Sequence, residues 1–179
     1  MKFTETALPG AYLIDIDAIA DERGFFARTV CVEQFTQRGL NPRFVQQSVS
    51  YNRHAGTLRG LHFQGSPHEE EKLVRVTRGA VFDVIVDLRR NSPAFGRWFG
   101  VELGADNHRQ LYIPGGVAHG FQTLLPDTEI FYEMAMPFRP DAARGLRWND
   151  PALGIAWPDC TDRVISERDQ ALPLLKELA

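Results

Sequence analysis

The sequence predicts an all-β protein, an antiparallel sandwich or barrel with a few short helices. Residues 73–79 alternate apolar and polar side chains, which is the pattern of a half-buried strand. Residues 80–88 form a nearly continuous β-branched run, typical of a strand buried on most of its surface. Turn-forming residues fill 89–96 and 104–109. Short strands separated by such turns are typical of all-β sandwiches and barrels.

Further strands and two short helices complete the expected elements. The strands are expected at 97–103, 110–114, 119–124 and 128–136. One helix is expected over 31–39, ended by Gly39. A second is expected near the C-terminus over 166–178, begun by Ser166, with Asp169 at the capping-box position and an interruption at Pro173. From residue 137 on, we expect ordered loops packed over the sheet by Trp148 and Trp157.

Length and composition limit the classes of function. The 179 residues fit a single domain, 1–179, and 44% hydrophobic with 24% charged residues is a normal globular balance. A formal net charge of −3 gives no indication of a nucleic-acid partner. Without an apolar run of about 18 residues or a signal-peptide core, we expect no membrane span and a cytoplasmic location. Cys31 and Cys160 are far apart and are expected to be reduced thiols.

Two histidine motifs carry the chemistry. The stretch 59-RGLHFQ-64 places His62 in an apolar run, and 112-YIPGGVAHGF-121 places His119 after a Pro-Gly-Gly turn. Together they resemble the two motifs of the cupin superfamily, which are jelly-roll barrels that often bind a metal. Here Gln64 and Lys72 stand where metal-binding cupins have a histidine and a glutamate. An amide is a poor ligand for a transition metal and an ammonium repels a cation, so we expect no metal.

The remaining groups suit proton transfer next to a carbonyl. We expect Arg59, His62, Gln64, Lys72 and His119 to converge on the barrel mouth. A neutral histidine is a general base near neutral pH, and a buried cation stabilises a developing oxyanion. With a tyrosine to return a proton, this set can remove a proton α to a carbonyl through an enolate without a cofactor. Arginines near the mouth would hold a diphosphate.

A more specific resemblance covers nearly the whole chain. It is carried by 21-DERGFF-26, 44-FVQ-46, 58-LRGLHFQ-64, 72-KLVRV-76, 82-FDVIVDLR-89, 92-SPAFG-96, 107-NHRQLYIPGGVAHGF-121, 145-GLRWNDP-151 and 157-WP-158. These motifs resemble the dTDP-4-dehydrorhamnose 3,5-epimerases, which are metal-free cupins. The resemblance implies a cofactor-independent epimerase that inverts C3 and C5 of a nucleotide-linked 4-keto-6-deoxyhexose. It also implies a homodimer with strands and aromatic residues exchanged across the interface, and the apolar segment 11–20 has the character of an edge strand.

The resemblance implies a role for each site residue. His62 looks like the base and Asp169 its orienting partner. Lys72 looks like the cation beside the enolate oxygen, and Tyr132 like the acid on the opposite face. Phe138 falls where the family stacks an aromatic residue on the nucleobase. Other substrate contacts are expected from Arg23, Phe26, Arg28, Gln46, Ser48, Arg59, His119 and Arg168.

Without the resemblance several of these residues have simpler interpretations. Asp169 would be a helix-start carboxylate, Tyr132 a packed aromatic residue and Arg23 a solvated charge in a turn. Asp83 is expected to be either a structural carboxylate or a partner of a site residue. The acidic run 66-SPHEEE-71, which replaces a commoner glutamine-containing loop of the family, would be a solvated loop.

Some positions depart from the family pattern, and they leave alternatives open. Arg28 and Ala143 stand where the family usually has glutamate, and Gln47 and Ser48 replace an Asp-Asn pair. These positions fall where the nucleotide is read, so the preferred base could differ. The first alternative is a single-centre epimerase, at C3 or C5, for a CDP- or GDP-linked sugar. A metal-dependent cupin enzyme and a non-catalytic sugar- or nucleotide-binding cupin are the others.

Overall fold

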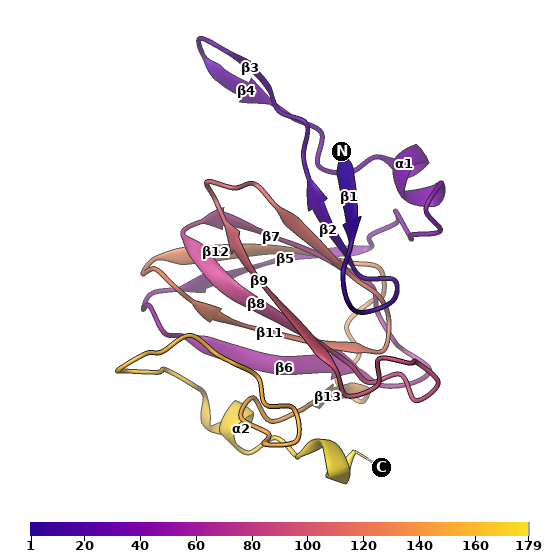
Figure 1. The fold of residues 1–179 in the computed structure, drawn as a ribbon, viewed down its shortest axis with the longest axis vertical. Coiled ribbons are helices and arrows are strands. Elements are labelled where there is room, and N and C mark those ends of the chain that lie inside the picture. The colour runs from indigo at the N-terminus through magenta and orange to yellow at the C-terminus, as the bar shows by residue number, and fades with distance from the viewer. Residues whose placement is uncertain (179) are drawn as a thin grey trace.

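The computed structural model describes residues 1–178, and these fold into two antiparallel sheets that face each other (Figure 1). One sheet has the order β1-β2-β10-β7-β12-β5 and the other β13-β6-β11-β8-β9. The strands are β1 (Lys2–Glu5), β2 (Tyr12–Asp15), β5 (Gln46–Asn52), β6 (Leu58–Gln64), β7 (Lys72–Arg78), β8 (Ala80–Asp87), β9 (Trp98–Gly104), β10 (Gln110–Ile113), β11 (Val117–Thr123), β12 (Thr128–Met134) and β13 (Ala143–Gly145).

The strand order is that of a jelly roll. Within each sheet, neighbouring strands come from distant parts of the chain, so that β5 lies beside β12 and β6 beside β11. This interleaving is the double Greek-key pattern of jelly-roll barrels. The six strands expected between residues 73 and 136 are confirmed as β7 to β12. The all-β fold class that the sequence predicts is therefore confirmed.

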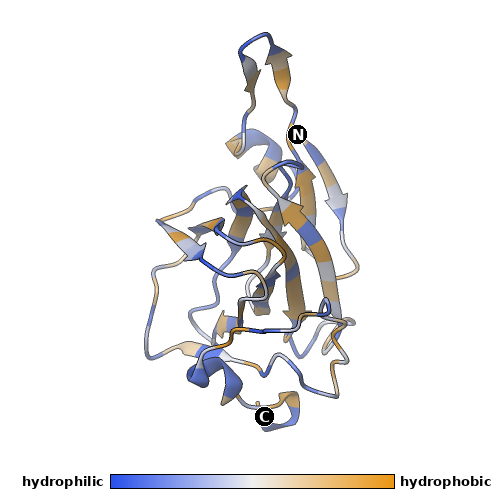
Figure 2. Ribbon diagram, turned by 90° about the vertical axis from the view of Figure 1, so that its left-hand side faces the viewer, coloured by the Kyte–Doolittle hydropathy of each residue, from blue (hydrophilic) through white to orange (hydrophobic). Residues whose placement is uncertain are grey.

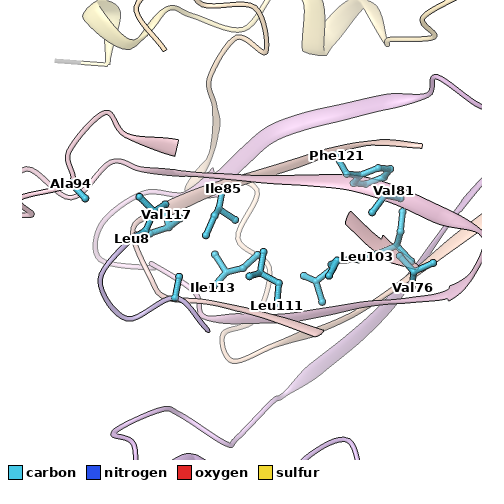
Figure 3. Packing of buried hydrophobic residues seen from close by; sticks show 13 residues of the cluster. Leu8, Val76, Val81, Ile85, Ala94, Leu103, Leu111, Ile113, Val117 and Phe121 are labelled. Carbon is cyan, nitrogen blue, oxygen red and sulfur yellow. The ribbon is translucent and has the colours of Figure 1, made fainter. Parts of the chain in front are cut away.

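The main core lies between the two sheets (Figure 3). Inward-facing side chains alternate with outward-facing ones along each strand, as in other sandwiches. On β8, Val81 and Ile85 point into this core and are fully buried. A second apolar cluster, built on Val84, Val86 and Leu146, lies under the C-terminal segment and includes Trp157. The loops after residue 137 thus cover the outer side of the five-stranded sheet, as expected.

Several strands were not expected, and each has a physical reason. Strand β5 reads QQSVSYN and lies at the edge of its sheet with most of its residues exposed, so its apolar pattern is limited to Val49 and Tyr51. Strands β3 (Ile19–Asp21) and β4 (Gly24–Phe26) form a separate two-stranded hairpin. Figures 1 and 2 show this hairpin projecting from the body of the molecule, and we call residues 19–26 the arm. Ile19 and Phe26 on the arm are 72% and 75% exposed.

Both helices are shorter than expected. Helix α1 covers Val32–Thr36, and the chain then turns through Gly39, whose φ is +69°. Helix α2 covers only Glu167–Gln170, and Pro173 separates it from a 3₁₀ turn at Leu175–Glu177. Ser166 caps α2 as expected, because its Oγ accepts a hydrogen bond from the Asp169 backbone N–H at 3.1 Å. The carboxylate of Asp169 bonds elsewhere in the molecule, so the predicted capping box is wrong.

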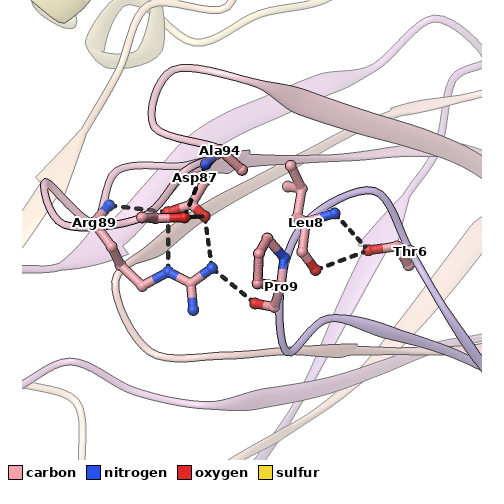
Figure 4. A network of polar contacts seen from close by, with 7 residues as sticks. Thr6, Leu8, Pro9, Asp87, Arg89 and Ala94 are labelled. Carbon is pink, nitrogen blue, oxygen red and sulfur yellow. Dashed lines mark hydrogen bonds and ion pairs between the residues drawn. The ribbon is translucent and has the colours of Figure 1, made fainter.

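A buried carboxylate ties the N-terminal loop to one end of the barrel (Figure 4). Asp87, at the end of β8, is fully buried and accepts hydrogen bonds from Arg89 Nη2 at 2.6 Å and from Ser92 Oγ at 2.6 Å. Arg89 Nη2 also donates to the Pro9 carbonyl at 2.8 Å. These bonds outweigh the effect of burial and hold the pKa of Asp87 below its ordinary value.

Two further findings concern the described chain as a whole. None of the helices in residues 1–178 is long and apolar enough to cross a membrane. Cys31 and Cys160 are both free thiols and partly buried.

Candidate active site

A cavity of about 360 Å³ opens between the two sheets. It collects most of the candidate residues from segments that are far apart in the sequence. Its walls come from β5, β6, β7, β11, β12 and β13, together with the start of α2. The lining residues are Ser48, Val49, Ser50, Arg59, His62, Phe63, Gln64, Glu70, Lys72, His119, Gly120, Phe121, Tyr132, Met134, Phe138, Ala143, Arg144 and Arg168.

His62 faces the cavity from the five-stranded sheet and is held from behind by Asp169. The distance from His62 Nε2 to Asp169 Oδ1 is 2.7 Å, and the other carboxylate oxygen accepts a hydrogen bond from the Gly60 N–H at 3.1 Å. The His62 side chain is 43% exposed, whereas that of Asp169 is 7% exposed. Burial would raise the pKa of Asp169, but the bonds from His62 and Gly60 outweigh it and lower the pKa. The carboxylate therefore stays ionised and fixes the imidazole.

Two glycines bring β6 and β11 close enough to form this arrangement. A Cβ on Gly60, where φ is +111°, would lie 2.7 Å from the Gly120 Cα, and one on Gly120 would lie 2.7 Å from the Arg59 carbonyl oxygen. The pairing of the two strands also shifts register between His119 and Phe121. Bulges of this kind re-aim side chains next to active sites. His62 and His119 lie opposite each other on the two strands, directly next to this register shift.

Lys72 and Tyr132 approach the cavity from the opposite, six-stranded sheet. They lie on the adjacent strands β7 and β12, so the cavity separates them from the imidazole of His62. Burial raises the pKa of Tyr132 far above its ordinary value, the Asp83 carboxylate adds to this, and Arg59 opposes it. The phenol is therefore protonated throughout the neutral pH range and can donate a proton.

A second histidine–carboxylate pair lies deeper in the cavity, on the same five-stranded sheet as His62. His119 Nε2 is 2.9 Å from Asp83 Oδ2, and the exposures of the two side chains are 5% and 0%. The ring of His119 packs edge-on against Tyr132, with 5.9 Å between the centroids. Asp83 is thus the hydrogen-bonding partner of the cavity residue His119, which is one of the two roles expected for it.

The other predicted contacts near this cavity lie along its rim. Arg59 is held by Asn52, whose Oδ1 accepts from Arg59 Nε at 2.7 Å. Gln46 does not line the cavity itself, but its Oε1 accepts a hydrogen bond from the N–H of the lining residue Phe138 at 2.6 Å. Phe138 itself is 57% exposed and leaves a ring face free at the rim. Ser48 and Arg168 also line the cavity.

The donor set at the two altered cupin positions does not suit a metal. Gln64 uses its amide nitrogen toward the His68 carbonyl at 3.1 Å and its amide oxygen toward the Arg139 N–H at 2.6 Å. Lys72 brings an ammonium into the same cavity from the opposite sheet. Within residues 1–178, no three side chains among His, Cys, Asp and Glu are grouped closely enough to hold a metal ion.

Known proteins of one family match this chain over nearly its whole length. The profile of the family described as dTDP-4-dehydrorhamnose 3,5-epimerase matches residues 5–177. The chain belongs to this epimerase family. A curated dTDP-4-dehydrorhamnose 3,5-epimerase of Sinorhizobium fredii is 43% identical, with 99% of this chain and 91% of that protein covered.

Two solved epimerase structures are similar over their whole length. One, from Bacillus anthracis with TDP and PPi bound, is 45% identical with a TM-score of 0.92, and the match covers 97% of this chain and 98% of that one. The other, from Legionella pneumophila in complex with dTDP-4-keto-L-rhamnose, is 37% identical with a TM-score of 0.93, and covers 99% and 94%.

Three residues that the epimerase family implied as substrate contacts lie away from this cavity. Arg23 and Phe26 are on the arm, and Arg28 follows it. Arg23 pairs with Asp21, the Phe26 ring is exposed, and Arg28 donates weakly to Cys31 Sγ at 3.9 Å. None of the three lines the cavity of its own chain.

The epimerase cavity also contains residues that the sequence does not single out. Glu70 was interpreted as part of a solvated loop, but it lines the cavity wall. Arg144 and Phe63 pair across β13 and β6 and both contribute to the lining. Ser50 has the same strand face as Ser48, two residues away, and that spacing would have identified it once β5 was recognised.

Proposed function

We propose that the protein is a cofactor-independent dTDP-4-dehydrorhamnose 3,5-epimerase. It would convert dTDP-4-dehydro-6-deoxy-D-glucose to dTDP-4-dehydro-L-rhamnose by inverting C3 and C5. The observation that carries the proposal is the His62–Asp169 pair, which faces Tyr132 and Lys72 across one cavity. Family membership supports it, as does the dTDP-4-keto-L-rhamnose found in the Legionella structure.

The first step is proton removal by His62. The C4 ketone acidifies the C–H bonds at C3 and C5, so a positioned base can take either proton. The electron pair of the broken C–H bond moves into the ring to give an enolate whose negative charge is on the C4 oxygen. Asp169 fixes the imidazole tautomer and stabilises the imidazolium that forms, as the carboxylate does in other histidine dyads. Lys72 supplies the positive charge for the enolate oxygen.

The second step is proton return from the opposite face. Tyr132 lies on the facing sheet and keeps its phenolic proton because burial raises its pKa. Donation of that proton to the carbon that His62 deprotonated inverts the centre. Exchange with solvent then restores the phenol and the neutral imidazole. No step in this sequence requires a redox cofactor or a metal.

Cationic groups at the rim would bind the diphosphate, and Phe138 the base. Arg59 and Arg168 each present a guanidinium toward the cavity, which suits bidentate binding of phosphate oxygens. His119 lies deeper in the cavity and would contact the same substrate. The exposed Phe138 ring, braced by Gln46, would stack on the nucleobase. The TDP in the Bacillus anthracis structure supports thymine as that base.

Proton NMR in D2O tests the reaction directly. The purified protein is mixed with dTDP-4-keto-6-deoxyglucose without added metal, and the product is trapped by a reductase. The expected result is deuterium at both C3 and C5 and an L-lyxo product. Exchange at one carbon only would make the protein a single-centre epimerase. Exchange only with a CDP- or GDP-linked analogue would overturn the choice of base, and no exchange with any of them would overturn the epimerase function.

We also infer a homodimer in which the arm serves the partner's cavity. The arm exposes Ile19 and Phe26 to solvent, and large apolar groups on a protruding hairpin are typical of an interface. Arg23 and Phe26 cannot contact a substrate in the cavity of their own chain while they lie on this arm. A second copy related by twofold symmetry would bring them to the site reciprocally. The cytoplasmic location stays a prediction from the sequence.

Mixing two inactive variants tests this exchange. His62→Ala would disable the base, and an Arg23→Ala/Phe26→Ala variant would disable the arm. If the arm serves the partner, random mixed dimers contain one intact site and recover about a quarter of the wild-type activity. Failure to recover activity, with sedimentation confirming that mixed dimers form, would show that the arm serves its own chain.

A further inference from the structure

Glu70 is a largely buried acid that lines the cavity, although it comes from a run of three glutamates. Its side chain is only 10% exposed, whereas its neighbour Glu69 lies at the surface. Acidic side chains are rarely buried to this degree unless they are paired. The loop from Ser66 to Glu71 therefore turns one of its acids inward, next to the residues that the proposed reaction uses.

The two carboxylate oxygens of Glu70 have different partners in the wall. Oε1 lies 3.0 Å from Lys72 Nζ, and Oε2 accepts a hydrogen bond from Gln64 Nε2 at 3.3 Å. The Lys72 side chain is 12% exposed, so this ion pair is largely shielded from water. Gln64 is in turn fixed by the backbone at His68 and Arg139. Lys72 is thus connected through Glu70 to a rigid part of the barrel.

A lysine needs such a partner in order to act at a defined point. Its ammonium sits on a flexible four-carbon stem with three donors, and nothing in the stem itself fixes its position. One donor used by Glu70 sets the position of Nζ and leaves two donors for a ligand oxygen. A functional group must be held to within about 0.5 Å to be productive, which a shielded ion pair provides.

We propose that Glu70 is a positioning residue that holds the Lys72 ammonium against the C4 oxygen of the substrate. The inference rests on the proposed epimerase function, because Lys72 acts on the enolate only in that reaction. Glu70 does not contact the reacting atoms. Its effect passes through Lys72, and that route can be measured.

Two replacements of Glu70 separate its negative charge from its accepting oxygen, because glutamine removes only the charge and alanine removes both. Glu70→Ala should lower kcat by about 10- to 100-fold, since a misplacement of 1 Å can cost about 100-fold, with KM changed by less than about threefold. Glu70→Gln keeps an oxygen that accepts from Lys72, although its NH2 group would face the Gln64 Nε2 donor, and it should recover part of the rate. Glu69→Ala and Glu69→Gln are matched controls, because they make the same changes one residue away at the surface, and they should leave kcat unchanged.

A double substitution tests whether the effect passes through Lys72. In a Lys72→Ala background, the further change Glu70→Ala should cost no additional rate, because there is no ammonium left to position. Losses that multiply would overturn the inference and assign Glu70 a structural role. Equal kcat for Glu70→Ala and Glu69→Ala would overturn it as well. A wild-type protein without any C3 or C5 exchange would instead overturn the proposed function, so the two failures are distinguishable.

Discussion

Asparagine at position 169 is the sharpest test of the proposed base. In the wild type, one carboxylate oxygen accepts from His62 Nε2 at 2.7 Å and the other from the Gly60 N–H at 3.1 Å. Asparagine has the same shape but only one accepting oxygen, because its second atom is an NH2 donor. Whichever way the amide turns, one of the two contacts becomes donor against donor.

The size of the loss follows from the kind of bond that is removed. A hydrogen bond to a charged group contributes about 1.5–3 kcal/mol. If the amide oxygen faces Gly60, His62 loses its acceptor and is driven to the wrong tautomer. Each 1.36 kcal/mol in the barrier is about tenfold in rate, so Asp169→Asn should lower kcat by about 10- to 100-fold.

The assay compares Asp169→Asn with Glu167→Gln, which changes an exposed carboxylate on the same helix. The rate of deuterium incorporation at C3 and C5 is measured for both, with a thermal melt to confirm that each is folded. Deuterium exchange in Asp169→Asn within threefold of the Glu167→Gln control would refute the role of Asp169 in orienting the base.

Substitutions at three further positions probe other parts of the molecule. Tyr132→Phe should keep deuterium exchange at the deprotonated carbon but lower inversion by about 10²- to 10⁴-fold, which NMR of the product measures; equal loss of both would contradict a separate acid. Asp87→Ala should destabilise the protein by about 3–5 kcal/mol in urea unfolding, because it leaves Arg89 without its carboxylate. The pKa of Asp87 is lowered in the folded state, so its contribution to the free energy of unfolding is present above the ordinary carboxyl pKa and is lost as pH falls toward the folded value. The stability advantage of the wild type over Asp87→Asn should therefore shrink in acid. An advantage that grows in acid would contradict this. Gly120→Ala should cost about 1–3 kcal/mol by the same measurement, because its methyl group would meet the Arg59 carbonyl, and an unchanged midpoint would show that the strands can separate.

The regular alternation of apolar and polar side chains made the core strands of the barrel predictable. Strand β5 and the arm lack a long pattern of this kind and were not predicted. Strands β7 to β12 carry apolar side chains that the core requires, so their pattern can be read from the sequence. Strand β5 has only a short pattern, with Val49 and Tyr51 on one face, because it is an exposed edge strand that the core does not require to be apolar. The arm is equally hard to predict, since its apolar residues Ile19, Phe25 and Phe26 are largely exposed and lie outside their own chain's core.

The candidate site was predictable where residues fit a motif, and less so where it depends on contacts. His62, Lys72 and Tyr132 were named from the sequence and lie around one cavity. From residue type alone, Asp169 looked like a helix cap; its contact with His62 spans 107 positions, and only the family resemblance suggested it. Glu70 could not be separated from Glu69 and Glu71, because which of three adjacent acids turns inward depends on the path of the loop.

The orienting carboxylate belongs to a segment that follows every strand of the barrel. Contacts between distant segments hold α2 in place, such as the hydrogen bond from the Arg147 N–H to the carbonyl of Pro173, just after α2, at 2.8 Å. A chain cut between β13 and α2 would keep both sheets and most of the cavity wall, yet its imidazole would have no partner. During synthesis, the barrel can therefore close before the site is competent. Proteolysis near the C-terminus should therefore abolish activity by detaching α2, well before it reduces the content of β-structure.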